Sequence, residues 1–287
     1  MEGNLHQLQE YISLLGEHNL LREKNIPTDL ATSRVRYISY DSQDIEYNTL
    51  FVCKGAHFKP EYLTEAMEKG AFAYVSEERI PVIEDGEEKN IPYIIVSDIR
   101  RAMAFLAELY YNKVWEKITL VGITGTKGKS TATYFMKYVL DDYLKEQKKP
   151  AGAVISGIDN YDGVIKEESR LTTPEAFVLY KHMDNAVKSG IEYLTMEVSS
   201  QALKYHRTLG VIYDVGCFLN LGEDHISDVE HSDFEDYGNA KKILFQQSKI
   251  AVVNMDSSFA PDILEVAEAS PVTERIITFG VALGSGA

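Results

Sequence analysis

The sequence is poor in cysteine and has no long apolar run. Its 287 residues include only two cysteines, Cys53 and Cys217, each within a short apolar run. Two thiols cannot build a disulfide scaffold, so we expect both to be free and buried. No stretch approaches the ~20 apolar residues of a membrane-spanning helix, and residues 1–10 lack the apolar core of a signal peptide. We therefore expect a cytoplasmic protein without membrane insertion.

Positive charge is also scarce. The chain has 29 Lys and Arg residues against 44 Asp and Glu residues, a formal net charge of −15. Nucleic-acid-binding domains carry a basic face, so we expect no nucleic-acid partner. A negative field also repels phosphate groups, so any bound nucleotide must be held by local groups.

Length and pattern predict two α/β domains, because a domain usually has about 100–200 residues. We place the boundary at residues 115–117, which gives domains of residues 1–117 and 118–287. The elements expected in the first domain are strands at 35–40, 49–53, 71–75 and 93–96, helices at 60–69 and 99–111, and a surface loop at 84–90.

In the second domain, apolar strands alternate with helices. Strands are expected at 118–123, 151–155, 193–198, 215–221, 250–254 and 276–279, and helices at 129–143, 174–188, 234–247 and 258–269. Continuous apolar strands that alternate with helices predict a mostly parallel sheet covered by helices on both faces.

The strongest local motif is the run GITGTKGKS at residues 122–130. It follows an apolar strand and opens a helix, an arrangement in which backbone N–H groups and the helix N-terminus hold phosphate. Lys129 would reach the β- and γ-phosphates, and the Ser130 hydroxyl would ligate Mg²⁺. The strict P-loop pattern requires glycine at position 123, where this chain has Ile, and a glycine-rich turn without a ligand is the alternative.

Polar side chains follow two other strands of the expected sheet. Glu197 ends the strand at 193–198, and Asn220, Asp224 and His225 follow the strand at 215–221. Ligands of open α/β sheets lie at the carboxyl ends of strands, so Glu197 and His225 could share Mg²⁺ with Ser130 and nucleotide phosphates. A hydrogen-bonded structural histidine is the alternative for His225.

Three further motifs have simple structural explanations when taken alone. Residues 172–175 (TTPE) fit a helix N-cap with proline in the first turn. Lys241, beside Lys242 in a helix, fits a solvated charge. Residues 41–43 (DSQ) fit a turn stabilised by Asx or Ser side-chain bonding.

Taken in order along the chain, these motifs resemble those of the Mur ligases, and within them the MurE type. The resemblance covers residues 35–256 and rests on residues 41–43 with 49–52, 122–131, 172–175, 196–200 followed by Arg207, 218–221, 224–226, and 230–237 followed by Lys241.

The resemblance implies roles for individual residues. It implies ATP contacts at Gly125, Thr126, Lys127, Gly128, Lys129, Ser130, Thr131 and Asn220. It implies that UDP-MurNAc-L-Ala-D-Glu is held at its uridine end by Ser42 and at its muramoyl-peptide part by Thr172, Thr173, Ser199 and Arg207. It implies Mg²⁺ ligands at Ser130, Glu197, His225 and Lys241, the last as a carbamate formed with CO₂ (N6-carboxylysine). Lys129, Lys241, Glu197 and His225 would be the catalytic residues.

The chain departs from the family pattern in two places. Gln43 stands where the family commonly has Arg, which weakens an ionic contact there, and Gln201 stands where it commonly has His. Three features resemble those of the lysine-adding subgroup. They are Gln201, the long segment 224–241 and the TKGK sequence at 126–129. The family also carries a third, C-terminal ligase domain, which this chain is expected to lack. We also expect the ATP-binding domain at 118–287 to be incomplete, and the chain to be inactive alone.

The implied reaction is ATP-dependent amide formation. ATP would phosphorylate the D-Glu γ-carboxylate of UDP-MurNAc-L-Ala-D-Glu, and the amine of L-lysine, or alternatively of meso-diaminopimelate, would attack the acyl phosphate. A monomer is expected. The alternatives are a non-catalytic fragment that binds a UDP-sugar or nucleotide and a ligase similar to folylpolyglutamate synthetase, although the latter lacks a separate N-terminal domain with the pattern at residues 41–42.

Overall fold

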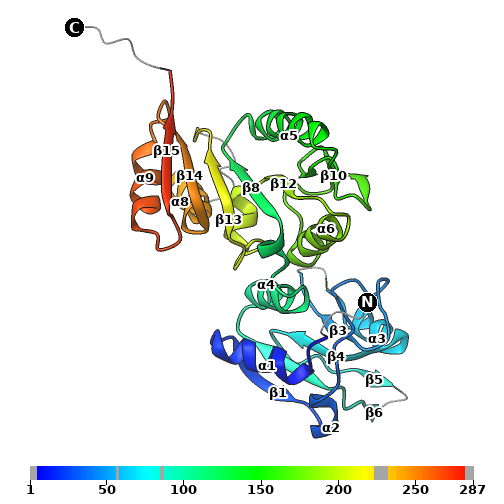
Figure 1. Cartoon of the computed structure of the whole chain (residues 1–287). Coiled ribbons are helices and arrows are strands. Elements are labelled where there is room, and N and C mark those ends of the chain that lie inside the picture. The colour runs from blue at the N-terminus through cyan, green and yellow to red at the C-terminus, as the bar shows by residue number, and fades with distance from the viewer. Residues whose placement is uncertain (1–4, 56–57, 85–86, 223–231, 282–287) are drawn as a thin grey trace, which may run out of the picture. The chain divides into compact units, whose positions relative to one another are not determined.

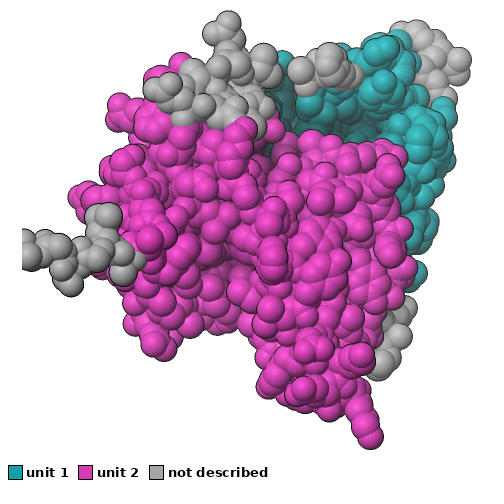
Figure 2. All heavy atoms as spheres, turned by 90° about the horizontal axis from the view of Figure 1, so that it is seen from above, with its two compact units in different colours: residues 1–112 teal, residues 113–287 magenta. Residues whose placement is uncertain are grey.

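The chain divides into two compact units, Met1–Asn112 (unit 1) and Lys113–Ala287 (unit 2), in a computed structural model (Figure 1, Figure 2). The structure describes residues 5–55, 58–84, 87–222 and 232–281. The expected boundary at 115–117 falls within a short 3-10 helix, Val114–Lys117, at the start of unit 2. No helix among the described residues is both long and apolar enough to cross a membrane.

Unit 1 is built on a five-stranded sheet with the strand order β1-β7-β4-β3-β2. Its strands are β1 (Leu21–Asn25), β2 (Tyr37–Ser39), β3 (Thr49–Val52), β4 (Ala71–Ser76) and β7 (Tyr93–Val96). Only β1 runs antiparallel to its neighbour. Its helices are α1 (Leu8–Glu17), α2 (Thr28–Ala31), α3 (Pro60–Lys69) and α4 (Ile99–Tyr110).

One expectation for unit 1 is wrong. Within the segment 84–90, expected to be a loop, residues 84, 87 and 88 belong to two short strands, β5 (Ile83–Glu84) and β6 (Glu87–Glu88), which pair antiparallel. Strands of two residues are too short for an alternating pattern to be visible in the sequence.

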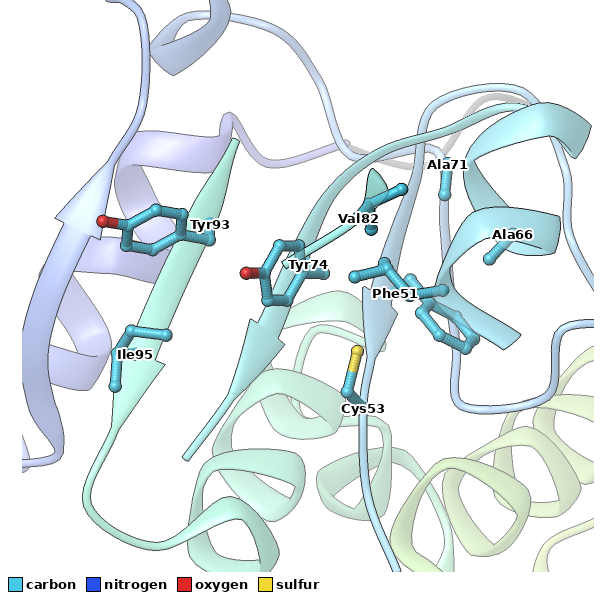
Figure 3. Close-up of a cluster of buried hydrophobic side chains, with 9 residues drawn as sticks. Phe51, Cys53, Ala66, Ala71, Tyr74, Val82, Tyr93 and Ile95 are labelled. Atoms are coloured by element: carbon cyan, nitrogen blue, oxygen red, sulfur yellow. The ribbon is translucent and has the colours of Figure 1, made fainter. Parts of the chain in front are cut away.

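The core of unit 1 lies around its central strands β3, β4 and β7, which are buried along nearly their whole length. Phe51 and Tyr74 are buried on β3 and β4, and Ala66 of α3 packs into the same cluster (Figure 3). Cys53 lies in this cluster as a free buried thiol, and burial raises its pKa. Cys217 of unit 2 was also expected to be buried, and it is free but only partly buried.

Unit 2 contains an eight-stranded sheet with the order β11-β10-β9-β12-β8-β13-β14-β15. Its strands are β8 (Thr119–Thr124), β9 (Ala153–Ile155), β10 (Asp159–Tyr161), β11 (Lys166–Glu168), β12 (Tyr193–Glu197), β13 (Tyr213–Phe218), β14 (Ser248–Asn254) and β15 (Arg275–Phe279). Its α-helices are α5 (Lys129–Glu146), α6 (Ala176–Lys188), α7 (Ser200–Lys204), α8 (Phe234–Gln246) and α9 (Ala260–Ala269).

The six strands from β9 to β15 in this order are parallel, and β10 and β11 form an antiparallel edge. The α/β class and the mostly parallel sheet agree with the sequence prediction. Strand β8 lies between β12 and β13 and runs parallel to both. The loop after β8 and the residues after β12 and β13 therefore meet at the carboxyl ends of the strands.

Candidate functional site

The glycine-rich loop connects β8 to α5, as the sequence predicts. Ile123 is part of β8 and is 2% exposed, so the departure from the strict P-loop pattern falls in the strand, before the loop begins. Gly128 precedes α5 with φ +84°, a backbone conformation that favours glycine. A Cβ at Gly125 would lie 3.0 Å from the Cβ of Leu219, so this position also requires a small residue.

Asn220 holds this loop in shape. Its Oδ1 accepts hydrogen bonds from the backbone N–H groups of Thr126 and Lys127, each 3.0 Å long, and its Nδ2 donates to the carbonyl of Lys127. In the structure Asn220 therefore contacts the loop, and a contact with ATP stays a prediction.

A second set of bonds ties the loop to helix α8. The hydroxyl of Tyr237 donates to Oγ1 of Thr126 over 3.1 Å, and both groups are buried. The same Oγ1 accepts the backbone N–H of Gly222 over 2.9 Å. Tyr237 was not among the predicted site residues, because its partner lies 111 positions away in the sequence.

Two lysines converge on one carbonyl oxygen of the loop. Lys129 Nζ donates to the carbonyl oxygens of Gly125 and Thr126 over 2.9 and 3.2 Å. Lys241 Nζ, which comes from α8, donates to the same Gly125 oxygen over 3.2 Å and lies 4.4 Å from the centre of the Tyr237 ring.

Lys241 is not a solvated charge. It is 1% exposed, so the simple structural explanation for this residue is wrong, whereas its neighbour Lys242 is partly exposed and pairs with Asp262 over 3.1 Å. Burial, and then the charge of Lys129, lowers the pKa of Lys241 from 10.5 to about 7. A substantial fraction of Lys241 is therefore neutral at neutral pH.

The expected metal ligands are described only in part. Glu197 ends β12 beside Ile123 of β8, is 2% exposed, and accepts the backbone N–H of Gly157 through Oε1 over 2.8 Å. Ser130 lies in the first turn of α5, and His225 lies outside the described residues. The described part of the chain holds no group of three or more His, Cys, Asp or Glu side chains arranged to hold a metal ion. Mg²⁺ bound to phosphates needs only one or two protein carboxylates, so the metal site stays a prediction.

A cavity of about 230 Å³ opens beside the two lysines. Its lining residues are Lys129, Arg170, Leu171, Thr172, Ser199, Ser200, Gln201, Arg207, Tyr237 and Lys241. Four of them are Lys or Arg residues, and three of these, Lys129, Arg170 and Arg207, are cations beside the partly neutral Lys241, although the chain as a whole is acidic. The cavity therefore has the local positive charge that the binding of a phosphorylated ligand requires.

The cavity brings Thr172, Ser199 and Arg207, expected to bind the muramoyl-peptide part, together with Lys129 and Lys241. Sequence reasoning did not select Arg170, Leu171 or Ser200 as site residues. Their position next to motif residues 172 and 199 was the signal available, since it puts them in the same loops.

Thr173 follows the cavity-lining residue Thr172 and is fully buried. Its Oγ1 donates to the carbonyl of Glu197 over 2.8 Å and accepts the backbone N–H of Ser199 over 3.0 Å. Thr173 thus joins the predicted substrate loop to the end of β12, which holds Glu197 and Ser199 in place.

The N-cap explanation for residues 172–175 is wrong. Helix α6 begins at Ala176, after Pro174, and its N-cap residue Glu175 makes no side-chain cap bond. Glu175 instead forms an ion pair with Nε of Arg207 over 3.0 Å, and Arg207 Nη1 donates to the carbonyl of Thr173. The motif is therefore held as a loop by Arg207.

Ser42 belongs to unit 1, within the turn expected for residues 41–43. Its hydroxyl donates to Glu65 Oε2 over 2.6 Å, and the Gln43 amide donates to Glu65 Oε1 over 2.6 Å. Lys69 Nζ bonds to Glu65 and to the Ser42 carbonyl. Hydrogen bonds from Lys69, Ser42 and Gln43 lower the pKa of Glu65 to about 2. A uridine contact at Ser42 stays a prediction.

Residues 123–285 match the family described as the Mur ligase middle domain. The UDP-N-acetylmuramyl-tripeptide synthetase of Lactobacillus delbrueckii subsp. bulgaricus is 39% identical over 275 residues, which are 95% of this chain and 51% of that protein. The UDP-N-acetylmuramoyl-L-alanyl-D-glutamate–L-lysine ligase of Enterococcus faecalis is 41% identical over 273 residues, 92% of this chain and 49% of that protein.

A solved structure of a UDP-N-acetylmuramoyl-L-alanyl-D-glutamate–2,6-diaminopimelate ligase has the same fold. It matches with a TM-score of 0.76 and 22% identity over 98% of this chain and 53% of that one. The chain spans about half the length of the curated relatives it matches. The family match over more than half of its residues shows that the chain belongs to the Mur ligase family.

Proposed function

We propose that the chain forms the nucleotide-binding and UDP-precursor-binding parts of an ATP-dependent amide ligase of peptidoglycan precursor synthesis. Its substrate would be UDP-MurNAc-L-Ala-D-Glu, and L-lysine would be added. The observation that carries the proposal is the cavity in which Lys129, Lys241, Arg170 and Arg207 meet beside the phosphate loop of an acidic chain. ATP and UDP-linked substrates would place the reaction in the cytoplasm.

The reaction has two steps. The D-Glu γ-carboxylate attacks the γ-phosphorus of ATP, which gives an acyl phosphate and ADP. The amine of lysine then attacks the acyl carbon, and inorganic phosphate leaves as the amide forms. Phosphoryl transfer depends mainly on positioning and charge neutralisation. Lys129, together with the backbone N–H groups that begin α5, would neutralise the transferred phosphoryl group.

Arg207 is suited to position the precursor, because its own side chain is held in place. Arg207 is 9% exposed, and its guanidinium is held by Glu175 and the Thr173 carbonyl. Thr172 and Ser199 line the same cavity and supply hydroxyl groups. A fixed cation with two hydroxyl groups would orient the carboxylate of the peptide part toward the phosphate loop.

The residues present fit a magnesium site. Ser130 and Glu197 supply oxygen atoms at the carboxyl ends of the strands, where the phosphate loop lies, and His225 would join them. Lys241 would contribute as a carbamate, for which its neutral amine attacks CO₂ and releases a proton. The lowered pKa of Lys241 supports this step. The resulting anion would also attract Lys129, whose charge opposes the ammonium form. When bound, Mg²⁺ would neutralise the phosphate charges.

Lysine is favoured over meso-diaminopimelate because the 41% identical Enterococcus faecalis relative is named as an L-lysine ligase. The relative named for 2,6-diaminopimelate is 22% identical and supports the fold alone. A ligase similar to folylpolyglutamate synthetase is not favoured, because the named relatives match nearly the whole chain, including unit 1.

The test joins this chain to the second half of the Enterococcus faecalis relative and measures ADP release. We expect release that requires both UDP-MurNAc-L-Ala-D-Glu and L-lysine, and little with meso-diaminopimelate. Lys129→Ala in the same protein is the background control. A folded protein that binds both ATP and the UDP precursor without turnover would support the non-catalytic alternative. Turnover with a reduced folate and glutamate would instead support a ligase similar to folylpolyglutamate synthetase.

The 287-residue chain alone is a second comparison. We expect it to bind ATP without steady ADP release, because closing of a further domain commonly completes such sites. Steady release that depends on the precursor and lysine would contradict this expectation.

A further inference from the structure

Arg170 lines the cavity beside the phosphate loop from a short segment that is held on both sides. The segment follows β11 at the edge of the sheet. Before Arg170, the Ser169 hydroxyl donates to the carbonyl of Ser156, and the Ser169 backbone N–H donates to the carbonyl of Ile158 over 3.1 Å. After it, Thr173 is fully buried and bonds to the end of β12. The backbone at Arg170 is therefore fixed beside the cavity, although its side chain is exposed.

The turn that receives Ser169 also lies against the expected metal ligand Glu197. The backbone N–H of Gly157 donates to Oε1 of Glu197 over 2.8 Å. A Cβ added to Gly157 would lie 3.3 Å from Oγ1 of Thr172, which lines the cavity next to Arg170. The segment that carries Arg170 therefore lies at the carboxyl end of β12, beside the strand that leads into the phosphate loop.

The other three basic residues of this cavity have partners within the chain. Arg207 pairs with Glu175 over 3.0 Å. Lys129 bonds to two carbonyl oxygens of the phosphate loop, and Lys241 bonds to one of them. Within the described part of the chain, Arg170 has neither an ion pair nor a hydrogen bond, so the donors of its guanidinium are available to a ligand.

The peptide part of the proposed precursor has two carboxylates and needs a cation for each. D-Glu is joined to L-Ala through its amino group, so its α- and γ-carboxylates are both free. In the proposed reaction the γ-carboxylate is phosphorylated and becomes the amide, and Arg207 would orient it. The α-carboxylate keeps its negative charge throughout. A bound carboxylate that leaves water needs a separate charged partner.

We propose that Arg170 binds the α-carboxylate of D-Glu and selects the free acid over the α-amide. This assignment rests on the proposed function, because it names a contact with the same precursor. A guanidinium offers two parallel N–H donors, which match the two oxygens of a carboxylate. A carboxamide presents one oxygen and one NH₂ group, so the amide loses one hydrogen bond and the ionic attraction.

Arg170 should contribute to binding and not to the chemical step. The charge of the α-carboxylate is the same before and during phosphoryl transfer, so a cation bound to it stabilises the substrate and the transition state equally. In the protein joined to the second half of the Enterococcus faecalis relative, Arg170→Gln should therefore raise KM about tenfold or more and leave kcat nearly unchanged. A fall in kcat with unchanged KM would place Arg170 at the reacting group and contradict the proposal.

The main test measures, by isothermal titration calorimetry, how the 287-residue chain binds two ligands that differ in one group. They are UDP-MurNAc-L-Ala-D-Glu and UDP-MurNAc-L-Ala-D-isoglutamine, in which the α-carboxylate is an amide. We expect the parent chain to bind the acid about tenfold or more tightly than the amide. Arg170→Gln should bind both ligands equally, and Arg170→Lys should keep part of the preference. Lys166→Gln, which removes an exposed cation from neighbouring β11, should keep the full preference.

The other outcomes separate failure of this assignment from failure of the proposed function. A preference for the acid that persists in folded Arg170→Gln overturns the assignment and leaves the proposed function intact. A preference that is lost in Arg207→Lys instead gives the α-carboxylate to Arg207 and also overturns it. Equal binding of both ligands by the parent chain means that no residue recognises the α-carboxylate. Binding of neither ligand refutes the proposed function, and this contact with it.

Discussion

Two cavities lined by described residues of unit 2 lie at opposite ends of its parallel strands, and the smaller of these two is the better candidate site. The larger, of about 500 Å³, lies at the amino ends, where Lys249 of β14 and Asp214 of β13 line it. The smaller, of about 230 Å³, lies at the carboxyl ends beside the phosphate loop. In parallel α/β sheets ligands bind at the carboxyl ends.

The lysines of the two cavities explain the difference. Lys249 Nζ bonds to Asp214 over 2.8 Å, and this bond raises its pKa. The other oxygen of Asp214 accepts the backbone N–H of Leu120, so this pair joins three neighbouring strands. Lys241 bonds to a carbonyl oxygen, and burial lowers its pKa to about 7. The charge environment therefore identifies the site better than the volume does.

The largest expected effect is on nucleotide binding. Lys129→Ala should weaken ATP binding to the chain by about 10–100-fold, because a charged hydrogen bond contributes roughly 1.5–3 kcal/mol. Isothermal titration calorimetry measures the change, and Lys249→Ala is the control at the other cavity. Unchanged affinity in folded Lys129→Ala, or an equal loss in Lys249→Ala, would remove the distinction between the two cavities.

The next effect concerns the pH dependence of stability at Lys241. A lysine whose folded pKa lies near 7 binds fewer protons than the unfolded chain above that pH, so stability rises between pH 7 and 10.5. From pH 7 to pH 9, the free energy of unfolding should rise by about 2 kcal/mol relative to Lys241→Met. Urea denaturation in CO₂-free buffer measures this difference. A flat difference for Lys241→Met would refute the lowered pKa of Lys241.

A smaller effect is expected at Tyr237. Tyr237→Phe removes the hydrogen bond to Thr126 and should cost about 1 kcal/mol of stability and a few-fold in ATP affinity. Thr126→Val and the double variant complete a double-mutant cycle. Strictly additive effects on ATP affinity would show that Tyr237 does not position the loop through Thr126.

The smallest effect is expected at Lys249. Its ion pair with Asp214 is partly exposed, so Lys249→Met should cost about 0–1 kcal/mol. The pKa of Lys249 in the folded chain is raised above 10.5, its value in the unfolded chain. The ion pair therefore stabilises the fold fully below pH 10.5, and this stability is lost only as the pH rises through the folded-state pKa. The difference from the parent chain should therefore stay constant between pH 7 and 9. A pH-dependent difference in urea denaturation over this range would contradict the contrast with Lys241.

Local sequence predicted the parts of the site that depend on neighbouring residues. Strand β8, the loop and α5 follow from an apolar run, glycines and a helical pattern. The place of Glu197 beside β8 follows from parallel strands. Helix α1 was missed although Leu8, Tyr11, Ile12 and Leu15 recur at helical spacing and Glu10 completes a capping box with Gln7. Strand β1 has the sequence LREKN and could not be predicted, because antiparallel pairing with β7 defines it.

The burial of Lys241 could not be derived from its own helix. The carbonyl that it contacts lies 116 positions earlier in the chain, so only the resemblance to the Mur ligases singled this lysine out. The same holds for Thr173, whose partners lie 24 and 26 positions away in the sequence and replaced the expected N-cap. Long-range contacts decide whether a polar residue is solvated, structural or part of a site.

The central claim is that the carboxyl-end cavity binds the phosphates of ATP beside Lys129 and Lys241. The most direct measurement is a crystal structure of the chain with a non-hydrolysable ATP analogue, Mg²⁺ and bicarbonate near neutral pH. We predict phosphate density against the backbone N–H groups of residues 126–130 with Lys129 turned toward it, and extra density at the end of Lys241. Phosphate density in the amino-end cavity beside Lys249, or an unmodified Lys241 that points to solvent with no metal nearby, would contradict the account.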